Sequence, residues 1–252
     1  MAAEADRPPP EPTPHGLAAS GALPWLGLAA VVAAIIAFNI VNNRVAPRAD
    51  ALTAPLELAA LAGLAWVCGL GLVEVGLARS TWARGLRWAA GSALVVGVVF
   101  GIAIALPVTR AGFLDRRADL ALGLPLIQAV VATAIATAVL EEFAFRGVLW
   151  GLVNRLRGPV YATVISSVLF GLWHILPSLR LNRNNEAVGS LFGRGPGIVP
   201  AVVVLGAVAT VLAGVVLCEL RRRSGSLLAP LGMHLATNCL GYVFSAVVWA
   251  IT

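Results

Sequence analysis

Long apolar runs, separated by short polar segments, follow one another from residue 23 almost to the end of the chain. A helix needs about 20 consecutive apolar residues to cross the hydrocarbon core of a bilayer. The pattern therefore predicts an all-α fold, a polytopic bundle of seven transmembrane helices. The predicted spans are 23–41, 55–77, 86–106, 122–150, 159–177, 198–220 and 226–250.

Two of these spans depart from the usual length. The run 159–177 is short, whereas the run 122–150 is long enough to tilt strongly or to break near Pro125, so the count could be eight. Glycines four residues apart let helices approach closely. Such pairs occur at Gly97 and Gly101 and at Gly147 and Gly151.

The first 20 residues differ from the rest of the chain. They contain five prolines and three acidic side chains, a composition that cannot bury enough apolar area to fold. We predict a disordered Pro-rich tail at 1–20, N-terminal transmembrane helices at 21–121 and a C-terminal transmembrane core at 122–252. Because the tail is acidic and the run after it is long, it is unlike a signal peptide, and the first helix is expected to stay in the membrane.

Composition indicates a membrane protein. The chain has 252 residues, of which 59% are hydrophobic and 12% charged, and its mean hydropathy is +0.89. A soluble domain carries about 25% charged residues, so an ordinary soluble protein is excluded. The net charge of +6 does not indicate a nucleic-acid partner, because the basic residues lie between the apolar runs rather than on one basic face. All 18 of them are Arg and none is Lys, which is typical of the codon bias of a GC-rich genome. This usage suggests a bacterial source, and hence the bacterial inner membrane.

The arginines also set the expected orientation, since loops rich in Arg and Lys stay in the cytoplasm. Arg221, Arg222 and Arg223 form the densest short basic segment, so 221–225 is expected to be a cytoplasmic loop. Counting back through seven helices places the N-terminus in the cytoplasm and the C-terminus outside. An eighth helix before that loop would reverse the prediction for the N-terminus.

Two adjacent carboxylates and an arginine interrupt the fourth apolar run. Glu141, Glu142 and Arg146 are expensive at membrane depth, since each charge costs about 2.5–3.5 kcal/mol at a helix centre. The i,i+4 spacing predicts an ion pair between Glu142 and Arg146, which could be purely structural or part of a catalytic site. Glu141 lies about 100° round the helix from Glu142, so it can face another surface.

Two further polar motifs follow on later runs. Phe170 and His174 end one run, and His234 and Asn238 lie inside the last, four residues apart in each case and so on one helical face. A single membrane histidine is more often a hydrogen-bond donor between helices than a catalytic group. Phe170 is expected to pack, and Asn238 could merely bridge helices. The remaining histidine, His15, belongs to the predicted tail.

In this order, Glu-Glu-x-x-x-Arg, Phe-x-x-x-His and His-x-x-x-Asn resemble the motifs of the CPBP family, the bacterial relatives of CAAX prenyl endopeptidases. The resemblance covers about residues 124–250. It implies a helical bundle that encloses a polar cavity within the membrane, and an intramembrane endopeptidase that uses a glutamate to activate water. The substrate would be a peptide or protein near the membrane face, with or without a lipid.

The resemblance also implies a role for each motif residue. Glu141 would be the general base, His174 would help hold the attacking water, and His234 and Asn238 would bind the oxyanion. Burial makes a carboxylate a stronger base than it is in water, which suits the first of these roles. The core 122–252 would then be the catalytic part of the chain.

No cofactor is predicted, although Glu141, His174 and His234 could together bind zinc. Zinc peptidases usually place two histidines four apart on one helix and keep a separate glutamate as base. Here the two histidines lie on different helices. If zinc took Glu141, the base would have to be Glu142, which is already needed to neutralise Arg146. We therefore predict a metal-free site, in which Glu142 and Arg146 position the catalytic groups.

Two other functions are compatible with buried acids and histidines. A transporter or proton-coupled carrier could use them as a proton relay, but such proteins usually show internal repeats, and none is recognisable in this chain. A non-catalytic membrane scaffold of the immunity type would not need the complete set of motif residues. The expected partners are a peptide or protein substrate and the lipid bilayer, with no nucleic acid.

Overall fold

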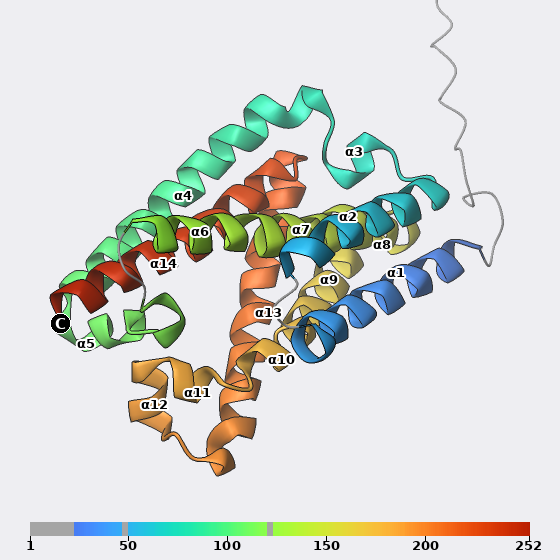
Figure 1. Ribbon diagram of the computed structural model, residues 1–252. Coiled ribbons are helices and arrows are strands. Elements are labelled where there is room, and N and C mark those ends of the chain that lie inside the picture. The colour runs from blue at the N-terminus through green and yellow to red at the C-terminus, as the bar shows by residue number, and fades with distance from the viewer. Residues whose placement is uncertain (1–22, 47–49, 120–122) are drawn as a thin grey trace, which may run out of the picture.

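The structure is a computed structural model that describes residues 23–46, 50–119 and 123–252. These residues form a bundle of helices of very different lengths, and their only β contact is an isolated bridge between Asp115 and Asn185 (Figure 1). The all-α fold predicted from the sequence is confirmed. The predicted tail at 1–20, with His15, lies outside the described residues.

The N-terminal half is built from three long helices joined by short ones. Helix α1 runs on into a π-helical turn, and α4 is preceded by two short helices. The bounds are α1 Leu23–Ile40, η2 Val41–Val45, α2 Asp50–Val67, α3 Leu72–Val75, η3 Arg79–Thr81, α4 Trp82–Ala105, α5 Pro107–Arg110, η4 Ala111–Phe113 and η5 Arg116–Ala118.

The C-terminal half begins with a long helical rod, residues 124–157, that contains two π-helical stretches. The rod consists of α6 Leu124–Thr133, η6 Ala134–Val139, α7 Leu140–Glu142, η7 Phe143–Leu149 and α8 Trp150–Arg157. It is followed by α9 Pro159–Trp173, α10 Ile175–Ser178, α11 Leu181–Asn184, α12 Glu186–Phe192, η8 Pro196–Ile198, α13 Val199–Ser224 and α14 Leu228–Ile251.

Six helical segments of the described chain are long and apolar enough to cross a membrane. They are Pro24–Val45, Leu72–Ala105, Leu124–Arg157, Pro159–Ser178, Pro196–Ser224 and Leu228–Ile251. The remaining apolar run forms a shorter helix, Thr53–Val67. The helical membrane bundle is therefore confirmed, with six long spans and one shorter apolar helix.

The second predicted span, 55–77, is wrong in its C-terminal part. Helix α2 ends at Val67, and the chain then turns through Gly69 and Gly76, whose φ angles are 70° and 81°. Glycine reaches these angles without the strain that a side chain would add. A Cβ atom at Gly76 would also lie 2.6 Å from Cζ of Arg221, so this turn gives the end of α13 the room to pack against α3.

The expected loop at 221–225 is also corrected by the structure. Helix α13 continues to Ser224, and Arg221 is buried, with 3% of its surface exposed. The Arg221 guanidinium donates hydrogen bonds to the carbonyl oxygens of Val73, at 3.3 Å, and Glu74, at 2.8 Å. Arg221 therefore joins α13 to α3, because the last carbonyls of the short helix α3 need donors from outside it.

Two pairs of helices dominate the packing, α4 with α14 and α9 with α13 (Figure 1).

Of the two glycine pairs noted in the sequence, Gly147 and Gly151 lie where the rod approaches α3 closely. Cβ atoms there would lie 3.2 and 3.1 Å from atoms of α3. Gly97 would meet only one atom, at 3.8 Å, and Gly101 none within 4 Å, so that pair does not mark a tight crossing.

The expected orientation can be tested at Arg223, which is exposed near the end of α13. We expect Arg223→Cys to be protected from a membrane-impermeant maleimide in intact bacterial cells and labelled after permeabilisation, because arginine clusters stay in the cytoplasm. The unsubstituted chain is the control for its native thiols, of which Cys68 and Cys218 are buried and Cys239 is half-buried. Labelling of Arg223→Cys in intact cells would place this end of the bundle outside.

Candidate active site

Both carboxylates of the first motif lie on a short α-helical turn between two π-helical stretches. Stretch η6 ends at Val139, α7 carries Glu141 and Glu142, and η7 begins at Phe143. A π turn holds extra residues, so it changes the direction of the side chains around it, and such turns are frequent at functional sites. Six successive residues of η7, 144–149, are buried, so this part of the rod packs against protein on all sides.

Glu142 and Arg146 form a fully buried ion pair, each with 0% of its surface exposed. Arg146 Nη1 donates to Glu142 Oε1 at 3.0 Å, the pairing that the i,i+4 spacing predicts. His234 of α14 reaches the same oxygen through Nδ1, at 2.8 Å. The guanidinium also lies 4.0 Å from the ring centre of Phe170, a cation–π contact that is stronger where water is excluded. The pair thus ties α9 and α14 to the rod.

Glu141 has a different environment, although it is also buried, with 3% exposed. Its Oε1 accepts a hydrogen bond from Trp173 Nε1 at 2.9 Å. Its Oε2 lies 3.9 Å from Nε2 of His174 and 3.8 Å from Nε2 of His234. Among the described residues, Oε2 has no hydrogen-bond partner. A buried carboxylate oxygen that faces two imidazoles is placed to take a proton from water.

The two imidazoles are held by their other ring nitrogens. His174 Nδ1 lies 2.8 Å from the carbonyl oxygen of Phe170. A carbonyl oxygen can only accept, so Nδ1 carries a proton and the neutral ring has a lone pair at Nε2. His234 Nδ1 faces the Glu142 carboxylate in the same way. Both rings therefore turn Nε2 toward Glu141, since the partner of one ring nitrogen sets the role of the other.

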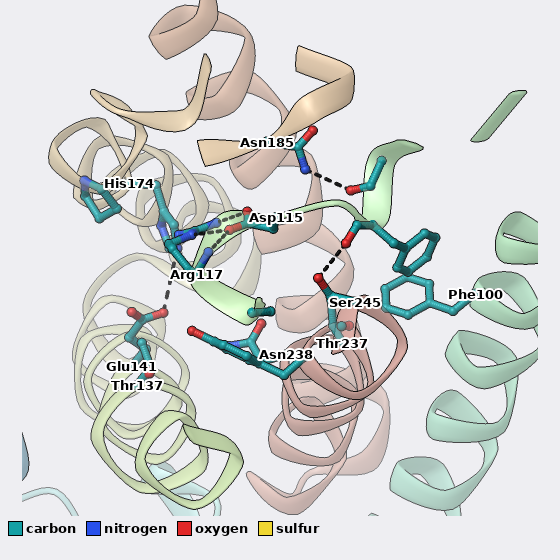
Figure 2. Close-up of a pocket in the computed structure, with 16 residues that line it drawn as sticks. Phe100, Asp115, Arg117, Thr137, Glu141, His174, Asn185, Thr237, Asn238 and Ser245 are labelled. Atoms are coloured by element: carbon teal, nitrogen blue, oxygen red, sulfur yellow. Dashed lines mark hydrogen bonds and ion pairs between the residues drawn. The ribbon is translucent and has the colours of Figure 1, made fainter. Parts of the chain in front are cut away.

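A cavity of about 570 Å³ reaches Glu141 and His174 (Figure 2). Glu141 and His174 lie in its wall together with Asn238 of α14. The segment between α5 and α6 contributes Asp115 and Arg117. Arg117 donates to both oxygens of Asp115, at 2.9 and 2.7 Å, and these bonds hold the pKa of Arg117 above its usual value. The structure therefore has a cavity with charged and polar side chains in its wall, the kind of cavity that the resemblance implies.

Three of the four residues predicted to be catalytic, Glu141, His174 and Asn238, line this cavity, and His234 lies behind Glu141. Polar atoms of His174 and His234 each lie within 3.9 Å of Glu141, and Asn238 lines the same space. Their catalytic roles stay predictions.

Three functional-site residues were missed in the sequence. Trp173 directly precedes His174 in the second motif, and this position beside a motif residue is the feature of the sequence that could have identified it. Asp115 and Arg117 lie in a polar connection that carries no motif, so nothing in the sequence singles them out.

The three alternative zinc ligands can be compared with the geometry of zinc sites. The described chain holds no group of three His, Cys, Asp or Glu side chains arranged for a metal ion. Glu141 Oε2 is 3.9 Å from Nε2 of His174 and 3.8 Å from Nε2 of His234, whereas two ligands of a tetrahedral zinc ion lie about 3.3 Å apart. The donor types suit zinc, but these side chains would have to move closer together to bind it.

A family profile described as Type II CAAX prenyl endopeptidase Rce1-like matches residues 123–240. No curated protein and no solved structure matches the chain. The matched segment runs from the start of the rod into α14 and contains every motif residue. The match confirms the resemblance seen in the motifs, and it favours a peptidase over a transporter.

Removing Glu142 should destabilise the protein, because Arg146 would stay charged and buried without its carboxylate. Breaking a buried pair in this way typically costs about 3–5 kcal/mol. We expect Glu142→Ala to lower the melting temperature and the folded yield in detergent, measured by thermal unfolding and size-exclusion chromatography. The control is Glu219→Ala, which removes only exposed contacts with Arg222 and Arg223. Equal melting of Glu142→Ala and the wild type would contradict a structural role for the pair.

Proposed function

Residues 123–240 belong to the Rce1-like family of type II CAAX prenyl endopeptidases, and on this premise we propose that Glu141 activates water to cleave a peptide bond within the membrane. At the level of the family, the protein is a multi-pass membrane protease that acts on a peptide or protein. One observation carries the mechanism. Glu141 has one oxygen held by Trp173 and the other turned toward Nε2 of His174 and of His234.

Water activation would use Glu141 together with His174. A water molecule between them donates one hydrogen bond to Glu141 Oε2 and a second to the Nε2 lone pair of His174, which leaves its own lone pairs available for attack. As the water oxygen bonds to the carbonyl carbon of the substrate, its first proton moves to Glu141. Both residues line the cavity, where a peptide can approach.

The oxyanion that forms on the substrate would be bound by α14. Asn238 lines the cavity, and His234 lies one helical turn earlier on the same face. A protonated His234 would keep one N–H on Glu142 and turn the other, on Nε2, into the site. With Glu141 and Glu142 ionised and Arg146 charged, that proton also brings the cluster to neutrality. Donors aimed at a developing oxyanion typically accelerate a reaction about 100-fold or more.

The second half of the reaction would return the enzyme to its starting state. The tetrahedral intermediate breaks its carbon–nitrogen bond, and Glu141 gives the proton that it took from water to the leaving nitrogen. The products are a carboxylic acid and an amine. Glu142 and Arg146 take no part in these proton transfers; they hold His234 in place.

The substrate is proposed to be the C-terminal segment of a CAAX-type peptide, with or without a prenyl group. The cavity supports a peptide at the membrane face, because its wall extends from Glu141 to residues 112–118, which lie between two membrane spans. The exclusive use of Arg as basic residue supports a bacterial inner membrane as the location.

Glu141→Gln removes the base but keeps the shape of the side chain and an acceptor for Trp173. We expect this variant to fold normally and to cleave about 100- to 10,000-fold more slowly, the usual contribution of a general base. The assay uses protein in proteoliposomes and two fluorogenic CAAX peptides, one prenylated and one not. Glu219→Gln, outside the cavity, should cleave at the wild-type rate. Near-normal turnover by Glu141→Gln, or no cleavage of either peptide by the wild type, would contradict the proposed function.

Metal removal should leave the activity intact, because each proton transfer above uses side chains alone. We expect activity in proteoliposomes to survive prolonged treatment with EDTA and 1,10-phenanthroline, and elemental analysis to find no stoichiometric zinc. Loss of activity that added zinc restores, with about one zinc bound per chain, would reject the metal-free mechanism and make His174 and His234 zinc ligands.

A further inference from the structure

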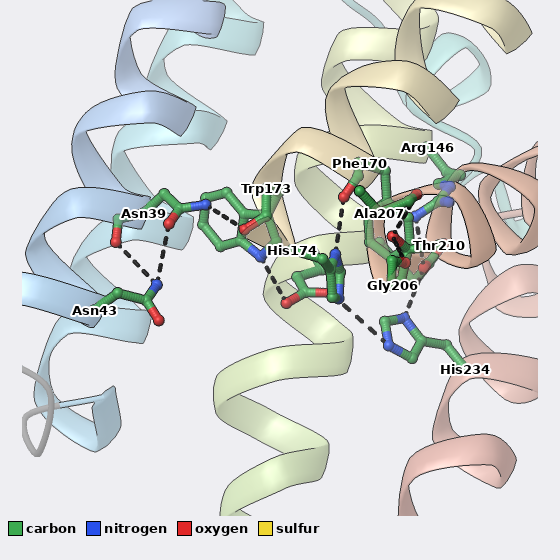
Figure 3. Close-up of polar contacts among 12 residues, drawn as sticks. Asn39, Asn43, Arg146, Phe170, Trp173, His174, Gly206, Ala207, Thr210 and His234 are labelled. Atoms are coloured by element: carbon green, nitrogen blue, oxygen red, sulfur yellow. Dashed lines mark hydrogen bonds and ion pairs between the residues drawn. The ribbon is translucent and has the colours of Figure 1, made fainter. Parts of the chain in front are cut away.

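Trp173 is the last residue of α9, and its indole reaches the base of the proposed reaction. Its Nε1 donates a hydrogen bond of 2.9 Å to Oε1 of Glu141. Its ring packs edge-on against Phe145, with ring centres 5.7 Å apart. In Figure 3, Trp173 lies between Asn39 of α1 and His174. The proposed reaction uses only Oε2 of Glu141. The hydrogen bond from Trp173 to Oε1 therefore takes no part in the proton transfers themselves.

That bond can fix the rotation of the carboxylate. The last torsion of a glutamate side chain is soft, so an unrestrained carboxylate samples a broad range of angles. With Oε1 held by Trp173, Oε2 is directed toward Nε2 of His174 and of His234, 3.9 and 3.8 Å away. Catalytic groups must be held within roughly 0.5 Å of their working positions, which such a bond helps to achieve.

The N-terminal half of the chain also holds the backbone of Trp173 in place. In a continuing helix, the Trp173 carbonyl would accept from the N–H of residue 177, but Pro177 has none. Asn39 supplies the missing donor, since its Nδ2 lies 2.7 Å from the Trp173 carbonyl oxygen. Asn39 is buried, and its Oδ1 accepts from Asn43 Nδ2 at 3.0 Å, which fixes the direction of the amide.

The turn that carries these asparagines is attached to α2. Asn42 donates to Glu57 Oε2 at 3.2 Å and accepts from Thr53 at 3.1 Å. Polar contacts therefore follow one another from α2 through the end of α1 to the end of α9. The indole of Trp173 adds the last contact, to Glu141 on the rod.

We propose that Trp173 is a positioning residue for Glu141, and that Asn39 holds Trp173 in place through the carbonyl that Pro177 leaves without a helical donor. The inference rests on the proposed role of Glu141 as base. It makes α1, which lies outside the matched segment 123–240, part of the active site.

A positioning role and a packing role for Trp173 depend on different atoms. Packing needs the two rings, whereas positioning needs the N–H. Trp173→3-benzothienylalanine keeps the two-ring shape and replaces the N–H by sulfur, and Trp173→Phe is a second variant that also lacks the donor. The matched control is Trp82→Phe, because Trp82 Nε1 donates to the Leu77 carbonyl oxygen at 3.1 Å at the start of α4.

The measurement is kcat and KM in proteoliposomes for whichever of the two fluorogenic CAAX peptides the wild type cleaves faster, with the folded fraction checked by size-exclusion chromatography. We expect Trp173→3-benzothienylalanine to fold normally and to lower kcat about tenfold, as the loss of a hydrogen bond to a charged group would. KM should stay within about twofold, since the bond does not touch the substrate. Trp82→Phe should leave both constants unchanged.

The contribution of Asn39 is measured by a double-mutant cycle. Asn39→Leu has nearly the same shape but cannot donate, so it should lower kcat in the same direction. The double variant, which combines Asn39→Leu with Trp173→Phe, should lower kcat by a smaller factor than the product of the two single factors. The reason is that both changes act through one contact. Fully independent effects would overturn the part assigned to Asn39.

Failure of the inference can be told from failure of the proposed function. If both Trp173 variants keep the wild-type kcat while Glu141→Gln is inactive, the inference is overturned and the proposed function stands. A loss confined to KM would overturn it as well, because Trp173 would then act in substrate binding. Activity in Glu141→Gln would remove the proposed function and the inference together.

Discussion

The buried ion pair of Glu142 and Arg146 is the constraint on which the rest of the site depends. An unpaired charge in a dry interior costs several kcal/mol, so the surrounding helices must supply partners for both groups. His234 contacts Glu142, the ring of Phe170 lies under the guanidinium, and α13 approaches at Gly214, where a Cβ atom would lie 3.3 Å from Arg146 Nη2. Helices α9, α13 and α14 therefore converge on the rod at one pair of charges.

This convergence gives two adjacent carboxylates different chemistry. Glu142 contacts Arg146 and His234 through Oε1 and is not part of the cavity wall, whereas Glu141 lies in that wall and is held by Trp173. Oε2 of each carboxylate has no hydrogen-bond partner among the described residues, but Oε2 of Glu141 lies near Nε2 of both histidines. Two carboxylates of one site can take separate roles when their environments differ in this way. The His234 ring contacts Glu142 through Nδ1 and has Nε2 3.8 Å from Glu141 Oε2, so the structural pair also orients an imidazole beside the proposed base. The imidazole of His234 therefore both stabilises the buried ion pair and contributes to the proposed chemistry.

The sequence predicted what depends on local spacing. The apolar runs indicated the membrane bundle, and the i,i+4 spacing indicated the pair of Glu142 and Arg146, because neighbours on one helix are fixed by helical geometry. It could not predict contacts between distant segments. Asn39 and Trp173 are 134 positions apart, and Arg221 meets Glu74 across 147 positions, so both contacts follow from tertiary packing. The prediction of a loop at 221–225 is wrong for the same reason, because local sequence does not show that Arg221 is buried within α13.

The cavity and the arginine cluster lie toward opposite ends of α13. The last turn of α13 binds α3 through Arg221, whereas its first turn follows α12 and η8. With 26 residues, α13 is about 39 Å long, enough to reach from one membrane face to the other. Asn185, which directly precedes α12, lines the cavity and is bridged to Asp115, and Figure 1 shows α5, α11 and α12 grouped at the same end. An orientation with Arg221 in the cytoplasm therefore turns the cavity mouth toward the outer face, and the reverse orientation turns it toward the cytoplasm. The side of the membrane on which Arg223 lies thus decides which compartment supplies the peptide.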